Sequence, residues 1–505
     1  MGLLDVIKKQ WKYFTFTAIQ SGYNFGLTCI GVLISPYMYQ RTGMSLSLIA
    51  MVFGGLIPIV HIVVQPVVGV LSDIFPVKKI RRRFFIFVGI LVAVLTLPVI
   101  PFSDYIGIAC GDNESGLEDS INSSSNGSMK ISISIGVVFS LFSSGSLVLM
   151  QMPSRALIAD NIKKDEQRSA NFFAALLGGF SVLVFYTLAA TCAQMKYYYE
   201  LMFVSAGVFI LITGVFTILF SKENEKQISV NENTPLQDMK NESKEEKAPL
   251  SLEIVDPQQE TMTPPSPNNR SKFQIVGKSL LLFIKGFGWK LMGLVFLQTT
   301  ATCSVLVIGS SVANYYAINM FHAETTDPLY NYGISMSMVA MLLQSVVQCI
   351  SSLLSPLYAK HENILFFGTA FVCALCHSGM IAVDYLSTYY DEPPIWLLIA
   401  SFVLIGMVGT LGAVIQSVPY IIINKISSPK RFAIDLSFIG VVISVAFVLL
   451  SYFVSLLLSF GISLVCVFYI GAVLAILCTI GCGCLLPVLN APTKIILSAP
   501  TEHSL

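Results

Sequence analysis

Long apolar segments alternate with short polar ones along most of the chain. Many of these segments reach about 20 residues, the length that an α-helix needs to cross a hydrocarbon core of about 30 Å. Twelve such helices are predicted, and we therefore expect an all-α polytopic membrane protein. Their expected ranges are 14–39, 46–71, 84–101, 133–156, 170–193, 199–220, 287–317, 332–358, 364–384, 395–423, 433–459 and 462–488.

One long polar segment separates the sixth predicted helix from the seventh. Residues 221–286 are rich in charged residues and proline and contain few aromatic residues. Such a segment buries too little apolar area to offset the entropy lost on ordering, so we predict a disordered linker. It divides an N-terminal six-helix bundle (1–220) from a C-terminal six-helix bundle (287–490), which a short tail (491–505) follows. Transporters with this layout bind substrate between their bundles, near the membrane midplane.

Basic residues in the short loops predict how the chain is oriented. Lysines precede the first predicted helix, and five Lys and Arg residues lie between positions 78 and 83. Because basic loops stay on the cytoplasmic side, both termini and the linker are expected there. The loop 102–132 then faces outward, and it holds three N-x-Ser glycosylation sequons that begin at Asn113, Asn122 and Asn126. No retention signal is evident, so a plasma membrane location is favoured over a vacuolar or lysosomal one.

The amino-acid composition argues against several classes of function. Charged residues make up 12% of the chain, about half of the usual fraction in soluble domains. Acidic and basic residues nearly balance, at 29 and 30, so no net field favours nucleic acid as a partner. The sequence has no nucleophile elbow, no pair of catalytic acids and no Cys/His set with metal-ligand spacing. We therefore expect a protein that is not an enzyme, needs no cofactor or metal, and works as a monomer in the lipid bilayer.

The loop between the second and third predicted helices suggests a conformational latch. Gly69 and Asp73 lie four residues apart, hence on one helix face, and three arginines, Arg81, Arg82 and Arg83, follow. Asp73 is placed to accept from the positive N-terminus of the eleventh predicted helix. Such a charge cluster would hold the two bundles together and break when they rock. Three further charged residues are expected at this cytoplasmic gate: Arg155, Asp160 and Arg168.

The same stretch resembles a known family. The sequence VVQPVVGVLSD (63–73), followed by RRRFFI (81–86), is similar to the cytoplasmic signature of the major facilitator superfamily. More narrowly, it resembles the sucrose–proton symporters of plants and their animal relatives. Three other motifs share this resemblance: FGLTCIGVLISPYMYQRTGMS (25–45), QMPSRALIAD with QRSANFF (151–173), and SVPYIIINK (417–425). The resemblance implies two six-helix bundles and alternating-access transport of a sugar such as sucrose, with a proton.

The resemblance also raises the question of proton coupling. The plant symporters carry a buried aspartate in the fourth helix, and the corresponding position here lies near Ser144. The seventh predicted helix, where they also have acids, has none. Coupling would then depend on His61, because an unperturbed histidine pKa of about 6.5 suits proton transfer; His377 is the other histidine within a span. Without such a group, the protein would be an uncoupled facilitator.

The polar residues within the predicted helices favour a neutral cargo. A charged metabolite needs a counter-charge near the midplane, and the spans offer almost none. Amide and aromatic groups suit a disaccharide or glucoside, although each amide taken alone could simply bond two helices. The alternatives are a facilitator for a nucleoside or vitamin, or a sensor that moves nothing and signals through the linker. The substrate-binding candidates are Gln20, Asn24, His61, Gln65, Gln151, Gln298, Asn314, Gln344 and Tyr420.

Overall fold

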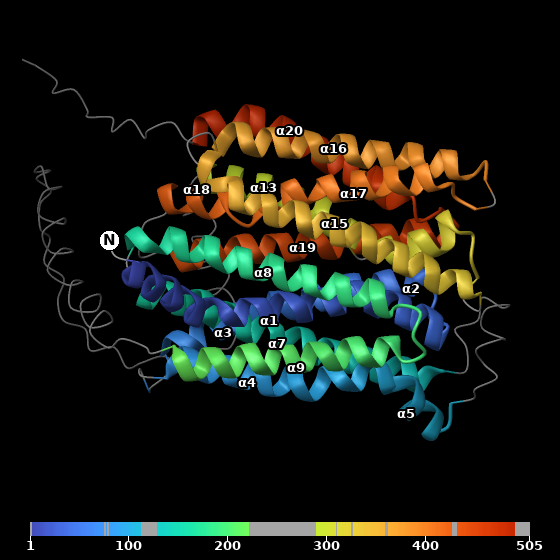
Figure 1. Cartoon of the computed structure of the whole chain (residues 1–505), viewed down its shortest axis with the longest axis horizontal. Helices are drawn as coiled ribbons and strands as arrows, with labels where there is room; N and C mark the ends of the chain where they lie inside the picture. Colours follow the sequence, from blue (N-terminus) through green and yellow to red (C-terminus); the bar gives the residue numbers. More distant parts are fainter. Residues whose placement is uncertain are drawn as a thin grey trace, which may run out of the picture.

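In a computed structural model of the chain, every regular element of the described part is helical. The structure describes residues 3–74, 77, 80–112, 129–162, 164–221, 289–309, 311–324, 327–358, 362–390, 392–426 and 432–489. The helices run side by side along the long axis of the molecule (Figure 1). We refer to the end at which the first helix begins as the N-side end, and to the opposite end as the far end.

The N-terminal bundle is built around its first helix. α1 (Leu3–Thr42) packs against α7 (Lys130–Asn161), α8 (Lys164–Cys192) and α9 (Tyr198–Phe220). The second predicted span consists of α2 (Leu46–Met51), the π-helical turn η1 (Val52–Leu56) and α3 (Ile57–Ile74). The third consists of α4 (Arg81–Thr96), the 3₁₀ turn η2 (Leu97–Phe102) and α5 (Ser103–Ala109).

The C-terminal bundle repeats this plan with its own irregular elements. Its first span is formed by α13 (Trp289–Gly309), α14 (Val312–Asn314) and the π-helical turn η3 (Tyr315–Met320). The others are α15 (Pro328–Tyr358), α16 (Glu362–Ser387), α17 (Ile395–Ile415) with α18 (Val418–Ile426), α19 (Phe432–Ser459) and α20 (Cys466–Leu489). The bundles meet where α8 packs against α15 and where α19 packs against α2 and α3.

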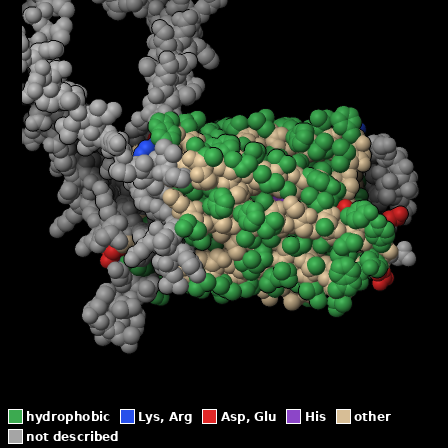
Figure 2. Space-filling model, turned by 90° about the horizontal axis from the view of Figure 1, so that it is seen from above, with side chains coloured by type: hydrophobic (Ala, Val, Ile, Leu, Met, Phe, Trp, Pro, Cys, Tyr) green, Lys and Arg blue, Asp and Glu red, His purple; other side chains and the backbone are tan. Residues whose placement is uncertain are grey.

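The outer surface is apolar over the length of the helices. Figure 2 shows hydrophobic side chains along one face, with Lys, Arg, Asp and Glu near the two ends. Exposed side chains such as Val63, Leu95, Ile212 and Leu449 belong to this surface. A soluble protein would not expose so large an apolar area, which a bilayer covers. The protein is therefore a multi-pass integral membrane protein.

α1 differs from the other long helices. Within the described part of the chain, eleven segments are long and apolar enough to cross a membrane, and α1 is not among them. It is nevertheless 40 residues long, or about 60 Å at 1.5 Å per residue. Its polar residues are buried against neighbouring helices, as at Thr17, Gln20 and Ser35. The first predicted span is thus the central helix of its bundle, which explains its lower hydropathy.

The predicted all-α fold is confirmed, and the predicted spans match the helices to within a few residues at most ends. The expected linker (221–286), the tail (491–505) and the sequons at Asn113, Asn122 and Asn126 lie outside the described residues, apart from Ser221. Orientation, membrane location, glycosylation and monomeric state stay predictions.

Candidate functional site

His61 contacts Ser144, near which the family resemblance places the missing acid. It lies in α3, and its Nε2 atom is 2.7 Å from the Oγ of Ser144 on α7. The two residues are 83 positions apart, and packing of α3 on α7 brings them together. The imidazole is therefore next to the residue at which the family resemblance leads us to expect a carboxylate. A histidine is a side chain that can take up and release a proton.

Gln20 is fixed by a chain of hydrogen bonds between α1 and α7. Its Nε2 donates to the Oγ of Ser154. The single hydroxyl proton of Ser154 is donated to the backbone oxygen of Gln151 at 2.8 Å, so Ser154 can only accept from Gln20. The amide orientation of Gln20 follows, and its Oε1 is buried without a protein partner.

Each buried glutamine of the described residues has a side-chain oxygen without a protein partner, as Gln20 does. Gln20, Gln65, Gln298 and Gln344 are 1%, 7%, 6% and 7% exposed, and the Oε1 atom of each has no protein hydrogen-bond partner. A buried carbonyl without a partner costs about 1–3 kcal/mol. Each of the four residues therefore carries an unpaired acceptor oxygen within its span.

Gln65 lies at the contact between the bundles. A Cβ atom built on Gly440 of α19 would lie 3.0 Å from the Oε1 of Gln65. α3 belongs to the N-terminal bundle and α19 to the C-terminal one, so this carbonyl faces the partner bundle across their interface. A larger residue at position 440 would press on it.

The remaining predicted binding residues have varied positions. Asn24 is half-buried and donates to the backbone oxygen of Gln20 at 2.7 Å, one turn earlier in α1. Gln151 is also half-buried. Asn314 is committed to helix contacts that are described below. Tyr420 belongs to α18, and its side chain lies outside the described residues.

His377, the second histidine within a span, lies inside the C-terminal bundle. It is 1% exposed, its Nε2 is 3.1 Å from the Oγ of Ser304, and that hydroxyl donates to the backbone oxygen of Gly471 at 3.0 Å. A Cβ atom on Gly471 would lie 2.2 Å from the imidazole, so only glycine leaves room for the ring. This packing between α13, α16 and α20 indicates a structural role.

The predicted cytoplasmic latch is only partly described. Arg82 donates through Nη1 to the Oγ of Ser72 at 2.6 Å, and Arg83 donates to the backbone oxygen of Ile218 at 3.4 Å. Both bonds lie within the N-terminal bundle. Arg155 is half-buried in α7. The side chains of Gly69, Asp73, Arg81, Asp160 and Arg168 lie outside the described residues, so the latch between the bundles stays a prediction.

Direct hydrogen bonds join the bundles at the far end, which sequence reasoning missed. Asn314 donates to the Oγ of Ser35 at 2.8 Å and accepts from the hydroxyl of Tyr330 at 2.8 Å. Closer to the surface, Gln40 of α1 donates to the Oδ1 of Asn331 of α15 at 3.2 Å. We call these five residues, Ser35, Gln40, Asn314, Tyr330 and Asn331, the far-end gate.

A second far-end contact joins α2 to α19. The hydroxyls of Ser47 and Ser455 are 3.1 Å apart, and each also lies within hydrogen-bonding distance of the other's backbone oxygen. Next to them, a Cβ atom on Gly54 would lie 2.3 Å from the Oγ of Ser451. The far ends of the bundles are therefore in close contact in this conformation.

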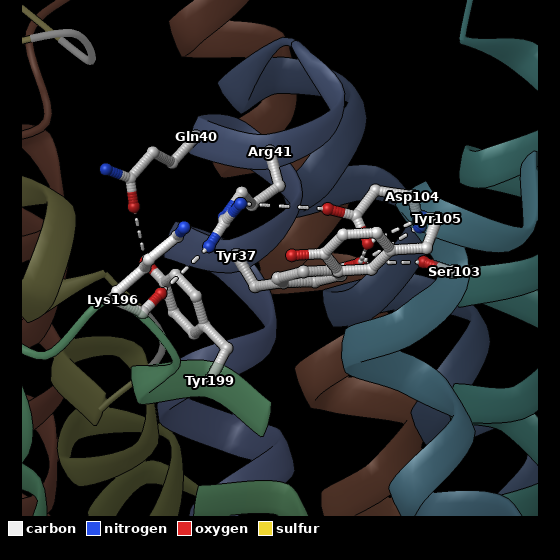
Figure 3. Close-up of polar contacts among 8 residues, drawn as sticks. All are labelled: Tyr37, Gln40, Arg41, Ser103, Asp104, Tyr105, Lys196 and Tyr199. Carbon is white, nitrogen blue, oxygen red and sulfur yellow. Dashed lines mark hydrogen bonds and ion pairs between the residues drawn. The ribbon is translucent and has the colours of Figure 1, made fainter. Parts of the chain in front are cut away.

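A charged cluster supports the far-end gate from within the N-terminal bundle (Figure 3). The Tyr37 hydroxyl is 2.9 Å from the Oγ of Ser103 and donates to Asp104 at 3.3 Å. Arg41 lies 3.9 Å from Asp104 and donates to the backbone oxygen of Lys196 at 3.3 Å. These contacts fix the last turn of α1, which carries Gln40.

The charged groups that the structure describes lie toward the ends of the spans, as Asp104, Glu200, Asp384 and Asp435 do. The middle of the spans carries amides, hydroxyls and the two histidines. Within the described ranges, no group of three or more His, Cys, Asp or Glu could hold a metal. This arrangement can bind a neutral polar molecule through hydrogen bonds, with a histidine available for a proton.

Sequence comparisons agree with the fold. The family model described as Major Facilitator Superfamily matches residues 16–409. The chain is 24% identical to the sucrose transport protein SUC3 of Arabidopsis thaliana, over 81% of this chain and 76% of that protein. It is 23% identical to the sucrose transport protein SUT1 of Oryza sativa subsp. japonica, over 82% and 75%. A shorter match to rice SUT5 reaches 33% identity over 28% of this chain and 25% of that protein.

Solved structures show the same fold. The crystal structure of a D-xylose–proton symporter superposes with a TM-score of 0.65 and 12% sequence identity, and covers 95% of this chain and 99% of the other. The inward-open xylose transporter XylE from E. coli superposes with a TM-score of 0.61 and 11% identity, over 94% and 96%. At these identities the likeness concerns the fold.

Proposed function

Because the chain belongs to the Major Facilitator Superfamily, which consists of transporters and not of enzymes, we propose that it carries a neutral sugar, such as a disaccharide or glucoside, across its membrane together with a proton. The bundles would alternate access to a site between them, as the two-bundle architecture allows. Sucrose is the first candidate cargo, since the relatives that match over most of this chain are named as sucrose transport proteins.

The four buried glutamine oxygens carry the proposal of a neutral cargo. Gln20, Gln65, Gln298 and Gln344 offer uncharged acceptors in a domain whose charges lie near the ends of the helices. Sugar hydroxyls can donate to such oxygens, and the amides carry no net charge that could pair with an anion. A cation would need carboxylates to offset its desolvation, and the described middle of the spans places none beside these residues.

The His61–Ser144 contact supports coupling to a proton. In the proposed cycle, His61 takes up a proton from one side, and the charged imidazole bonds to the Ser144 oxygen, which can accept once its own proton points elsewhere. The proton leaves when the bundles rock and His61 meets the other side. An imidazole can gain and lose a proton reversibly, as a coupling group must.

Uptake into proteoliposomes tests this function. Labelled sucrose, maltose, glucose and uridine would be offered with the outside acidic and without a pH gradient. We expect uptake of at least one of the sugars, with accumulation under the gradient, and no uptake of uridine. Sugar uptake that is the same with and without the pH gradient would indicate a facilitator. Uptake of uridine alone, or of none of the four compounds, would refute the sugar assignment.

A further inference from the structure

The four buried glutamines form two pairs at matching positions of the two bundles. Gln298 follows Gln20 by 278 positions, and Gln344 follows Gln65 by 279. Gln20 and Gln298 lie in the first span of each bundle, on α1 and α13. Gln65 and Gln344 lie in the second span of each bundle, on α3 and α15 (Figure 1).

A second pair of residues in each bundle has the same spacing. Tyr37 of α1 bonds to Asp104 near the end of the third span. In the other bundle Tyr315 lies within electrostatic range of Asp384, near the end of the corresponding span. Tyr315 follows Tyr37 by 278 positions, and Asp384 follows Asp104 by 280. An offset of 278 to 280 positions therefore relates the two tyrosine–aspartate pairs as well as the two glutamine pairs.

The four glutamines share their burial and an unpaired side-chain oxygen. All four side chains are more than nine-tenths buried, and the carbonyl oxygen of each lacks a protein partner. At Gln20 the orientation is fixed by Ser154, which has no proton left to donate. At Gln65 the oxygen faces Gly440 of the opposite bundle.

From this we propose that Gln20, Gln65, Gln298 and Gln344 form one quasi-symmetric set of hydrogen-bond acceptors, two from each bundle, which binds a polyhydroxylated solute through its hydroxyl protons. The inference rests on the proposed function and deepens it, because it names the chemical group that is recognised. A solute bound in this way bridges the bundles and is held by equivalent residues of both. A molecule without hydroxyl protons, such as a fully alkylated sugar, cannot satisfy these oxygens.

Substitution of the glutamines by methionine tests the set. Methionine has a similar length and no strong acceptor, so each of Gln65→Met, Gln298→Met and Gln344→Met should raise the KM for sucrose about tenfold or more, since a lost buried hydrogen bond costs about 1–3 kcal/mol. Gln348→Met is the matched control, because Gln348 lies one turn later in α15 and is half-buried. Its KM should stay within about twofold of the wild-type value. Unchanged KM in all three variants, with wild-type melting temperatures, would overturn the inference.

A second measurement uses only the wild-type protein and so does not depend on how the variants fold. Unlabelled sucrose and octa-O-methylsucrose would compete with labelled sucrose for uptake. The methylated sugar keeps its acceptor oxygens but has no hydroxyl protons, so we expect no competition at a hundredfold excess; inhibition comparable to that by sucrose would overturn the inference. Absence of sucrose uptake by the wild-type protein would instead refute the proposed function, and the inference with it.

Discussion

Asn314 donates a hydrogen bond of 2.8 Å to Ser35, and this bond joins the first spans of the two bundles. The hydroxyl of Tyr330 donates to the same Asn314 side chain, so both ends of the amide are occupied. In this conformation the Asn314 side chain connects the two bundles. We expect it to contribute to closure of the far end, and its role in substrate binding stays a prediction.

Replacing Asn314 by leucine should weaken closure of the far end. The substitution removes the bond to Ser35 and leaves the Tyr330 hydroxyl without its acceptor, at a cost of about 1–3 kcal/mol to the closed state. We expect faster alkylation of a cysteine introduced at Ser455, in a background that lacks the exposed Cys110 and Cys484. Ser337→Ala in α15 is the control, because that hydroxyl bonds only within its own helix in the described structure. Equal alkylation rates in both variants would show that Asn314 does not stabilise the closed far end.

A valine at Gly54 should prevent the far end from closing. A Cβ atom at this position would lie 2.3 Å from the Oγ of Ser451 across the bundle interface. Because the clash lies across the far-end contact between the bundles, Gly54→Val should lower the maximal transport rate by about tenfold or more, with a smaller effect on thermal stability. The double variant Gly54→Val/Ser451→Gly should recover part of the rate. A wild-type transport rate in Gly54→Val would show that transport does not require close contact between Gly54 and Ser451.

Asp104 should stabilise the far end through its acceptor oxygens more than through its charge. Arg41 is 3.9 Å away and its side chain is 32% exposed, so the ion pair contributes at most about 1 kcal/mol. The carboxylate also accepts from the Tyr37 hydroxyl at 3.3 Å and from the backbone nitrogen of Tyr105 at 2.9 Å. Asp104→Asn should therefore lower the melting temperature less than Asp104→Leu, measured in the same detergent. The reverse order would contradict this assignment.

Asp112 should make the protein sensitive to acid. Burial raises the pKa of this carboxyl, but bonds from the backbone nitrogen and hydroxyl of Ser132, both 2.7 Å, and from the nitrogen of Ile131 outweigh burial and hold the pKa below its usual range. A lowered pKa in the folded state stabilises it above the unfolded pKa of about 3.9, and this contribution is lost as the pH falls through the folded value. Melting temperatures from pH 7 down to pH 3 should fall more steeply for the wild-type protein than for Asp112→Asn. Parallel curves would exclude Asp112 as a source of the acid sensitivity.

Periodicity and length were enough to predict the fold. The spans are long apolar segments, and a helix is the local structure that satisfies backbone groups in lipid without a partner segment. Even α1 could be found, because its polar residues are interspersed with apolar ones. The π-helical turns at 52–56 and 315–320 could not be predicted, since they depend on packing against neighbouring helices.

Less of the candidate site than of the fold could be predicted from the sequence. The glutamines and His61 could be singled out because polar groups inside spans are costly. Their partners could not, since Ser144 is 83 positions from His61, and Ser154 is 134 from Gln20. The pairing of Gln20 with Gln298 was a readable signal, because an internal alignment of the two halves would have revealed the constant offset.

Sucrose counterflow tests the central claim most directly. Proteoliposomes loaded with unlabelled sucrose would be diluted into buffer that contains a trace of labelled sucrose, with no pH gradient. A carrier that accepts sucrose exchanges the two pools whether or not it needs a proton, so we predict a transient accumulation of label that is absent from protein-free vesicles. No accumulation, from protein that is folded and reconstituted in the bilayer, would contradict the assignment of this chain as a sucrose carrier.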